Sequence, residues 1–190
     1  ANPRRTIRAH YDLGNDFFAL FLDESLTYSS GVFEHPGATL EEASVAKIDR
    51  LCRKLELNPQ DHLLEIGTGW GAFAMHAARE YGCRVTTTTI SGEQFDLARA
   101  RIREAGLDHR ITVLFEDYRK LTGHFDKLVS VEMIEAVGHE YLGAFFGACS
   151  RLLHPHGLMA LQGITMPDHR YQRYRKSVDF IRKYVFPGSH

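Results

Sequence analysis

The stretch that most constrains the fold is residues 62–71, which read HLLEIGTGWG. A short apolar run breaks into Gly67, Gly69 and Gly71 at alternate positions, and a helical pattern begins at residue 72. Glycine accepts positive φ and lets the backbone approach a ligand without a Cβ in the way. A helix that begins there also offers free N–H groups and the positive end of its dipole to an anionic group. The stretch therefore predicts a strand, a tight turn and a helix start beside a ligand.

The spacing of the glycines narrows the class of ligand. It is G-x-G-x-G, not the G-x-G-x-x-G of dinucleotide binders, and Glu65 lies two positions before the first glycine. The next predicted strand ends in Thr89-Ile90-Ser91, without the carboxylate that a nicotinamide dehydrogenase uses to bind the ribose. The spacing and the position of Glu65 favour S-adenosylmethionine (SAM) over NAD, and the missing carboxylate also counts against a nicotinamide dehydrogenase. A strand-to-helix connection without a ligand is the alternative that the turn alone leaves open.

Composition excludes several classes of protein. The chain has 190 residues, 44% of them hydrophobic and 25% charged, which is typical of one soluble globular protein. A net charge of -1 gives no reason to expect nucleic acid as a partner. The three cysteines form no C-x-x-C pair and the eleven histidines no H-E-x-x-H, so we expect neither a disulfide framework nor a metal site. Residues 154–157 (HPHG) are expected to form a turn after a helix.

Targeting segments are also missing from the sequence. No apolar run reaches the ~18 residues of a membrane span, and the first residues lack the apolar region of a signal peptide. We expect a cytoplasmic protein. The chain does not begin with Met, and we expect it to be a fragment.

The order of the predicted elements indicates the fold class. Strands are predicted at 63–66, 84–90, 111–115, 125–131 and 158–164, with helices at 39–55, 72–81, 91–106 and 141–153 between or before them. Capping boxes, Thr39-x-x-Glu42 and Ser91-x-x-Gln94, mark two of the helix starts. Alternation of this kind predicts an α/β fold with a doubly wound, mostly parallel sheet. Ligands of such sheets lie at the carboxyl ends of the strands, where loops 67–71, 89–94, 116–119 and 131–138 are expected to meet.

Two flanking segments carry further expectations. Asn15 can cap a helix that carries Phe17, Phe18 and Phe21, whose apolar surface belongs either to the core or to an acyl-chain pocket. The tail at 169–184 is basic and aromatic. It is either a solvated helix face or a contact for anionic lipid headgroups, to which each basic side chain contributes about 1 kcal/mol.

Several motifs resemble a known family when they are taken together. They lie at 10–18 (HYDLGNDFF), 26–29 (LTYS), 65–71 (EIGTGWG), 89–94 (TISGEQ), 117–119 (DYR) and 186–188 (FPG). In this order and spacing they resemble the cyclopropane-fatty-acid synthase family of SAM-dependent methyltransferases, which includes the mycolic acid cyclopropane synthases. The resemblance implies a Rossmann-like SAM-methyltransferase sheet of seven strands, of which this chain lacks the last two. It also implies an N-terminal helical cap and substrate-side segment at 1–57 and a SAM-binding core at 58–190, incomplete at the C-terminus.

The resemblance assigns residues to the cofactor. Tyr28 and Ser29 would lie over the methionine part of SAM, and Val131 beside its sulfonium. The turn would pass beneath the cofactor, and the ends of the next two strands would contact its ribose and adenine. The residues implied in these roles are Glu65, Gly67, Thr68, Gly69, Trp70, Gly71, Thr89, Ile90, Gln94, Asp117, Tyr118 and Arg119.

The implied reaction adds a one-carbon unit to the double bond of an unsaturated fatty acyl chain. A carbocation results, and loss of a proton gives a cyclopropane, methylene or methyl-branched product. In the family a bound bicarbonate takes the proton, held by residues that include a glutamate matching Glu135. Ser30 and Gln162 stand here where the family has cysteine and histidine, and we assign Glu135, Ser30 and Gln162 to catalysis, with Glu132 as the nearby competitor.

Two other functions remain open on the sequence. One is a SAM-dependent methyltransferase of a small polar metabolite, and the other is a non-catalytic SAM-fold or lipid-binding protein. For the favoured function we expect an unsaturated acyl lipid as substrate and peripheral contact with an anionic membrane, at its inner face. The sequence does not predict the oligomeric state.

Overall fold

The computed structural model describes residues 15–178, 180 and 183. The motif at 186–188, the first residues of the motif at 10–18 and most of the tail beyond 178 lie outside this range. In chain order the elements are α2 (Asn15–Ala19), α3 (Leu40–Lys54), β1 (His62–Ile66), α4 (Ala72–Glu80), β2 (Arg84–Thr89), α5 (Gly92–Glu104), β3 (Ile111–Phe115), β4 (Phe125–Val131), α6 (Leu142–Leu152), β5 (Leu153–Gln162) and α7 (Asp168–Lys176). Three short 3-10 helices follow β3 and β4: η1 (Tyr118–Lys120), η2 (Ile134–Ala136) and η3 (His139–Tyr141).

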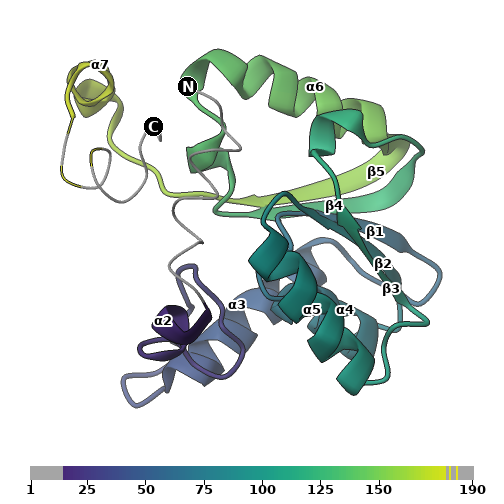
Figure 1. Cartoon of the computed structure of the whole chain (residues 1–190). Coiled ribbons are helices and arrows are strands. Elements are labelled where there is room, and N and C mark those ends of the chain that lie inside the picture. Colours follow the sequence, from purple (N-terminus) through teal and green to yellow (C-terminus); the bar gives the residue numbers. More distant parts are fainter. Residues whose placement is uncertain (1–14, 179, 181–182, 184–190) are drawn as a thin grey trace.

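The strands form one sheet in the order β3-β2-β1-β4-β5, and every neighbouring pair is parallel. Chain order therefore reverses at β1, where the chain returns from β3 to β4. Helices α3, α4 and α5 lie on one side of the sheet and α6 on the other (Figure 1). The predicted doubly wound parallel fold is confirmed. Among the described residues, no helix has the length and apolar character to cross a bilayer.

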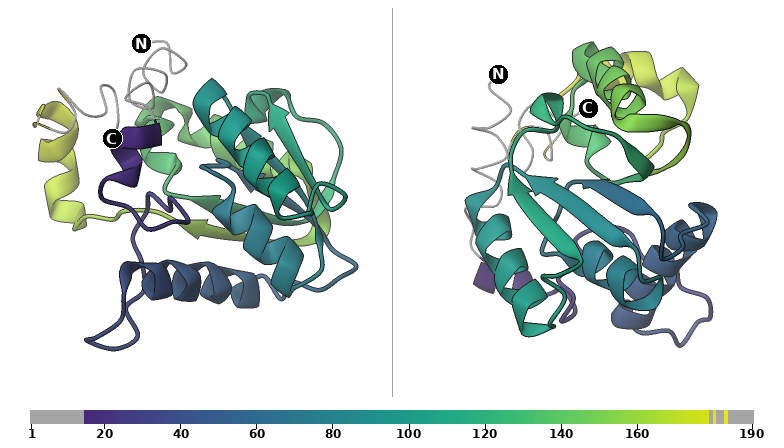
Figure 2. Two further views of the ribbon diagram at one scale, coloured as in Figure 1. Left: turned by 60° about the horizontal axis from the view of Figure 1, so that its bottom comes forward. Right: turned by 90° about the vertical axis from the view of Figure 1, so that its right-hand side faces the viewer.

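Each face of the sheet has its own buried cluster, because successive side chains of a strand point to opposite sides. Leu63 packs with residues of α3, α4 and α5, among them Ile48, Phe73 and Ile102. Leu64 belongs to the other cluster, which α6 covers with side chains that include Phe145. The right-hand view of Figure 2 shows the helices that cover the two faces on opposite sides of the strands.

The predicted turn at 154–157 is wrong, because β5 already begins at Leu153. Phe125 is in register with Leu153 and Lys127 with Leu158, so the residues between them form an irregularity in the pairing of β4 and β5. A strand that continues through an insertion of this kind bulges locally and then resumes its ladder. The proline and glycine in HPHG mark this bulge and not the end of an element.

Three predicted helix starts have different outcomes. The capping box of Thr39 and Glu42 is confirmed. The Ser91 box is only half formed: Ser91 Oγ accepts the N–H of Gln94, but the side chain of Gln94 accepts a hydrogen bond from Thr89. Asn15 is not a cap residue, because α2 already includes it as its first described residue and its Oδ1 accepts the indole N–H of Trp70 at 2.6 Å.

The α6 side of the sheet offers a test of how the core supports the ligand edge. Phe145 is completely buried and its ring lies 5.5 Å from that of Tyr118, whereas the adjacent Phe146 is 46% exposed. Phe145→Ala should lower the free energy of unfolding by about 3–5 kcal/mol, because it leaves a cavity in the core. Phe146→Ala, measured in the same urea titration, should cost less than about 1 kcal/mol. Equal losses for the two variants would contradict this description of the core.

Candidate active site

A cavity of about 740 Å³ lies at the carboxyl edge of the sheet. Its size is within the usual range for a small-molecule site. Its lining comes from the loop before α3, the glycine turn and the ends of β2, β3 and β4. It includes these residues assigned from the sequence: Tyr28, Ser29, Ser30, Glu65, Gly67, Thr68, Gly69, Trp70, Thr89, Ile90, Gln94, Asp117, Tyr118, Arg119, Val131 and Glu135. Gly71 and Gln162, the other two assigned residues, are not part of the lining.

The glycines of the turn have different neighbours. Gly69 has φ +52°, and a Cβ added there would meet nothing within 4 Å. A Cβ on Gly71, at φ +90°, would lie 3.4 Å from the Cβ of Ala98 in α5. Positive φ values explain why both positions hold glycine. Only Gly69 leaves open space towards the cavity, whereas Gly71 brings α4 close to α5.

The turn uses several of its N–H groups within the protein. Those of Gly67 and Thr68 donate to the carbonyl of Thr88 at 3.0 and 3.1 Å, and that of Gly71 donates to the Thr68 carbonyl. The Thr87 hydroxyl also donates to the Thr68 hydroxyl at 2.7 Å. These bonds attach the turn to β2, so the glycines contribute room for a ligand more than they contribute donors.

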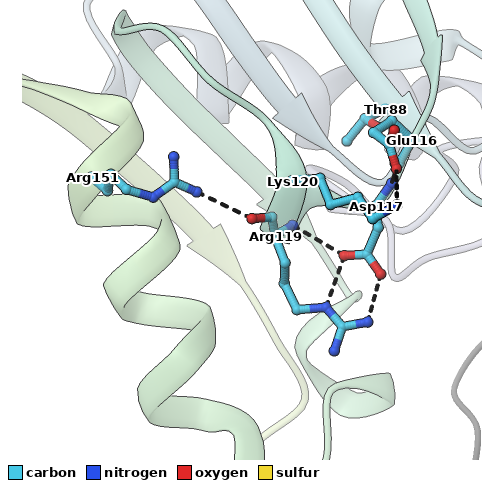
Figure 3. A network of polar contacts seen from close by, with 6 residues as sticks. All are labelled: Thr88, Glu116, Asp117, Arg119, Lys120 and Arg151. Carbon is cyan, nitrogen blue, oxygen red and sulfur yellow. Dashed lines mark hydrogen bonds and ion pairs between the residues drawn. The ribbon is translucent and has the colours of Figure 1, made fainter.

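The ends of β2 and β3 present polar side chains in fixed positions. Gln94 is 6% exposed and its Oε1 accepts the hydroxyl of Thr89 at 2.9 Å. Asp117 caps η1 and accepts two hydrogen bonds from the guanidinium of Arg119, at 2.9 and 2.6 Å (Figure 3). Such paired bonds hold a guanidinium in one plane. The Arg119 carbonyl in turn accepts a longer bond from Arg151 of α6.

The loop before α3 is held over the cavity by contacts that the sequence did not indicate. Arg101 of α5 donates to the carbonyls of Glu24 and Ser25, each at 2.9 Å, and to that of Trp70 at 3.1 Å. Lys47 of α3 donates from Nζ to the Ser29 hydroxyl at 2.6 Å. The segment that carries Tyr28, Ser29 and Ser30 is therefore joined to two helices of the core.

Aromatic side chains pack together at the loop before α3, beside the cavity. Phe18 is 1% exposed, and its ring lies 4.9 Å from that of Trp70 and 5.2 Å from that of Tyr28. Phe21 lies beyond the end of α2, half exposed, and lines the cavity. The aromatic segment was expected to belong either to the core or to an acyl-chain pocket. Phe18 is part of the core, whereas Phe21 lines the cavity.

A second polar group lies where β4 and β5 end. Glu132, with φ +47°, accepts hydrogen bonds at one carboxylate oxygen, Oε1, from the Ser30 N–H (3.0 Å), the Ser30 hydroxyl (2.7 Å) and Gln162 Nε2 (2.9 Å). Three donor groups from two residues thus meet at one carboxylate oxygen. Glu135 lies outside this group. Its Oε1 accepts the Ile164 N–H, and its buried Oε2 has no hydrogen-bond partner among the described residues.

Comparison with known proteins assigns the family. A sequence model described as mycolic acid cyclopropane synthetase matches residues 1–190. The chain belongs to this family. It is 45% identical over 192 residues to the tuberculostearic acid methyltransferase UfaA1 of Mycobacterium tuberculosis, a match that covers 97% of this chain and 45% of that protein. The chain therefore spans about half the length of this relative.

Solved structures of the cyclopropane synthase family have the same fold. The structure of the cyclopropane synthase MmaA2 from Mycobacterium tuberculosis superimposes with a TM-score of 0.89 at 33% identity, covering 98% of this chain and 69% of that one. The mycolic acid cyclopropane synthase CmaA1 complexed with SAH and CTAB gives 0.86 at 35% identity, with the same coverage. Recognition of the family from the sequence motifs is confirmed.

In this member of the family, two buried ionisable groups, Glu65 on β1 and Lys47 on α3, line the cavity. Burial raises the pKa of Glu65 on β1 to about 8, against the opposing influence of the Thr87 hydroxyl and of Lys47. Burial lowers the pKa of Lys47 to about 8, although Glu132, Glu65 and Asp23 attract its charge. Glu65 Oε2 has no hydrogen-bond partner among the described residues. A buried oxygen in this state is suited to a ligand that brings a donor.

Sequence reasoning missed Lys47 and Arg101, although Lys47 left a signal. It lies on the same helical face as Ala43, Ile48 and Leu51, which are all buried. A lysine within an apolar stripe requires partners, so its position alone pointed to a buried polar site. Arg101 carries no such signal, because its partners are backbone carbonyls far away along the chain.

Glu65 makes stability depend on pH. Its folded-state pKa of about 8 exceeds the ordinary value of 4.5, so the folded state binds more protons between these pH values and the free energy of unfolding falls as pH rises. Glu65→Gln cannot ionise and so avoids this loss of stability. Between pH 5 and pH 8, the free energy of unfolding of the variant relative to that of the wild type should therefore rise by on the order of 1–3 kcal/mol. Urea titrations across this range measure the difference. Glu80→Gln, at an exposed position of α4, serves as the control, and an equal gain there would refute the role of Glu65.

Proposed function

We propose that this chain binds SAM in the cavity at the carboxyl edge of the sheet. The observation that carries the proposal is Gly69, which is held at φ +52° with open space where a Cβ would point. Glu65 offers a buried oxygen to which no group in the described part of the chain donates, and this fits a ligand with N–H and O–H groups. The solved CmaA1 complex contains SAH, the molecule that SAM becomes when it gives up its methyl group.

The residues around the cavity suit the parts of this cofactor. Tyr28, Ser29 and Val131 would hold its methionine end, and the turn at 67–71 would pass beneath it. The carboxamide of Gln94 and the hydroxyl of Thr89 would meet the ribose, which compensates for the missing carboxylate after β2. Ile90 and the segment Asp117–Arg119 would border the adenine. When bound, SAM supplies a methyl group on a positively charged sulfur, already activated for transfer.

The substrate that we propose is an unsaturated acyl chain of a lipid. Apolar side chains form much of the cavity lining, among them Phe21, Leu22, Leu26, Met133, Ile164 and Met166. The CTAB in the CmaA1 complex is a single-chain amphiphile, which supports an acyl-shaped site. The chain's contribution to the reaction would be to align the double bond and exclude water, since an alkene attacks an activated methyl without a strong base. The product would be a cyclopropane, or a chain with a methylene group or a methyl branch that keeps one double bond.

Bicarbonate does not fit the site as the resemblance implied. The hydroxyl and N–H of Ser30 and the amide of Gln162, which would bind it, already donate to Glu132. The Glu135 oxygen without a partner among the described residues can accept the O–H of bicarbonate, but the donors that the negative oxygens of the ion require are already used. We therefore derive no step through bicarbonate.

Substitution of Gly69 tests the cofactor site. Gly69→Val should abolish SAM binding in isothermal titration calorimetry, because its side chain would occupy the space left for the cofactor. Gly123→Val is the matched control: Gly123 also has a positive φ (+90°) and open surroundings, but it is exposed and lies outside the cavity lining. Both variants share the cost of the backbone conformation, so only the first should lose SAM. Unchanged affinity in folded Gly69→Val would refute the site.

Vesicles test the substrate and the membrane contact together. With SAM and unsaturated phospholipid vesicles, the complete protein should produce acyl chains heavier by one CH2 unit, measured by mass spectrometry. Turnover should rise with anionic lipid and lose this dependence when the exposed basic residues of α7 are neutralised in the variant Arg170→Gln/Arg173→Gln/Lys176→Gln. Neutralising Lys54, Arg79 and Arg103, which are exposed elsewhere, should leave the dependence unchanged. Methylation of polar metabolites alone would contradict the proposed substrate.

A further inference from the structure

The donors of Ser30 and Gln162 bind a carboxylate that belongs to the protein itself, the side chain of Glu132. The Ser30 N–H, the Ser30 hydroxyl and the Gln162 amide converge on Glu132 Oε1 within 3.0 Å. Such an arrangement of donors is a typical anion-binding site. In this chain the anion at the site is the carboxylate of Glu132, the residue that directly follows β4.

The backbone keeps Glu132 in this position. Its N–H donates to the Gln162 carbonyl at 2.8 Å, which extends the pairing of β4 and β5 by one bond. Its φ of +47° is uncommon for any residue except glycine and persists only where the surroundings hold it. The three side-chain hydrogen bonds and the backbone bond to Gln162 therefore hold Glu132 in a strained conformation.

The charge of Glu132 acts within the cavity. Glu132 lines the cavity with Tyr28 and Lys47. Burial raises the pKa of Tyr28 and lowers that of Lys47, and the charge of Glu132 adds to the first shift and opposes the second. A negative charge so placed can stabilise positive charge that develops on an alkene during methyl addition.

We propose that Glu132 is the proton acceptor of the reaction and takes the place of a bound bicarbonate. The inference rests on the proposed function. After methyl addition the acyl chain carries a positive charge on carbon, and one of its neighbouring C–H bonds breaks. The electron pair of that bond closes a ring or forms a new double bond, and the proton passes to the Glu132 carboxylate, which later releases it to water. A C–H bond beside such a cation is strongly acidic, so an ordinary carboxylate is a sufficient base.

Bicarbonate binding tests the inference without any turnover. Glu132→Gly removes the carboxylate, exposes the donors of Ser30 and Gln162 and relaxes the backbone, because glycine accepts φ +47°. In isothermal titrations with bicarbonate, this variant should bind the ion and the wild type should not. Glu56→Gly is the matched control, since Glu56 is also a glutamate at positive φ (+53°), but it is exposed at the end of α3. Binding by the wild type as tight as that by Glu132→Gly would overturn the inference.

Turnover supplies the second test. Glu132→Gln keeps the shape of the side chain and removes the base, so turnover on unsaturated phospholipid vesicles should fall about 100-fold or more while SAM affinity is retained. The wild type should not respond to removal of carbon dioxide from the buffer, whereas Glu132→Gly should be nearly inactive there and recover when bicarbonate is added. Near-normal turnover of Glu132→Gln, or loss only in Glu135→Gln, would overturn the assignment. A wild type that methylates no acyl chain would refute the proposed function, whereas the bicarbonate titration would still show whether Glu132 occupies the place of the ion.

Discussion

The parallel pairing of β1 with β2 on one side and β4 on the other is the constraint on which the structure depends. It brings the carboxyl ends of three strands to one edge, and each strand there continues into a loop that borders the same cavity. The Thr88 carbonyl fixes the glycine turn by accepting the N–H groups of Gly67 and Thr68. The turn is followed directly by α4, since the hydrogen bonds to β2 already fix its backbone.

The cavity combines apolar walls with a small number of charged groups that stabilise one another. Lys47 comes from α3, Glu65 from β1 and Glu132 from the end of β4, so one helix and two neighbouring strands contribute ionisable groups to one space. A charge on Lys47 or Glu65, which are each 3% exposed, would be costly alone. Their mutual attraction and the hydroxyl of Ser29 reduce this cost, and a site results in which polar groups have defined positions.

The fold could be predicted from the sequence because it depends on local patterns. Residues close together in the sequence determine the alternating strands and helices, the Thr39 capping box and the glycine turn. Side-chain partners across the fold were less accessible: Gln94 has the spacing of a capping box, but it bonds to Thr89 because β2 brings that hydroxyl beside it. Arg101 meets carbonyls 76 and 77 residues away, a relation that only the packed structure defines. Glu132 could be identified as a candidate, but its contacts with Ser30 and Gln162 could not.

These contacts couple three positions that lie far apart along the chain, since Ser30 and Gln162 are separated by 132 residues. Exchange of Glu132 alone leaves donors without an acceptor, and exchange of Ser30 or Gln162 alone withdraws a bond from a carboxylate held in a strained conformation. The effect of each substitution thus depends on the other two, which is epistasis with a structural origin. Homologous chains should therefore change these three positions as a set, and a homologue with only one of them altered would carry the cost of an incomplete exchange.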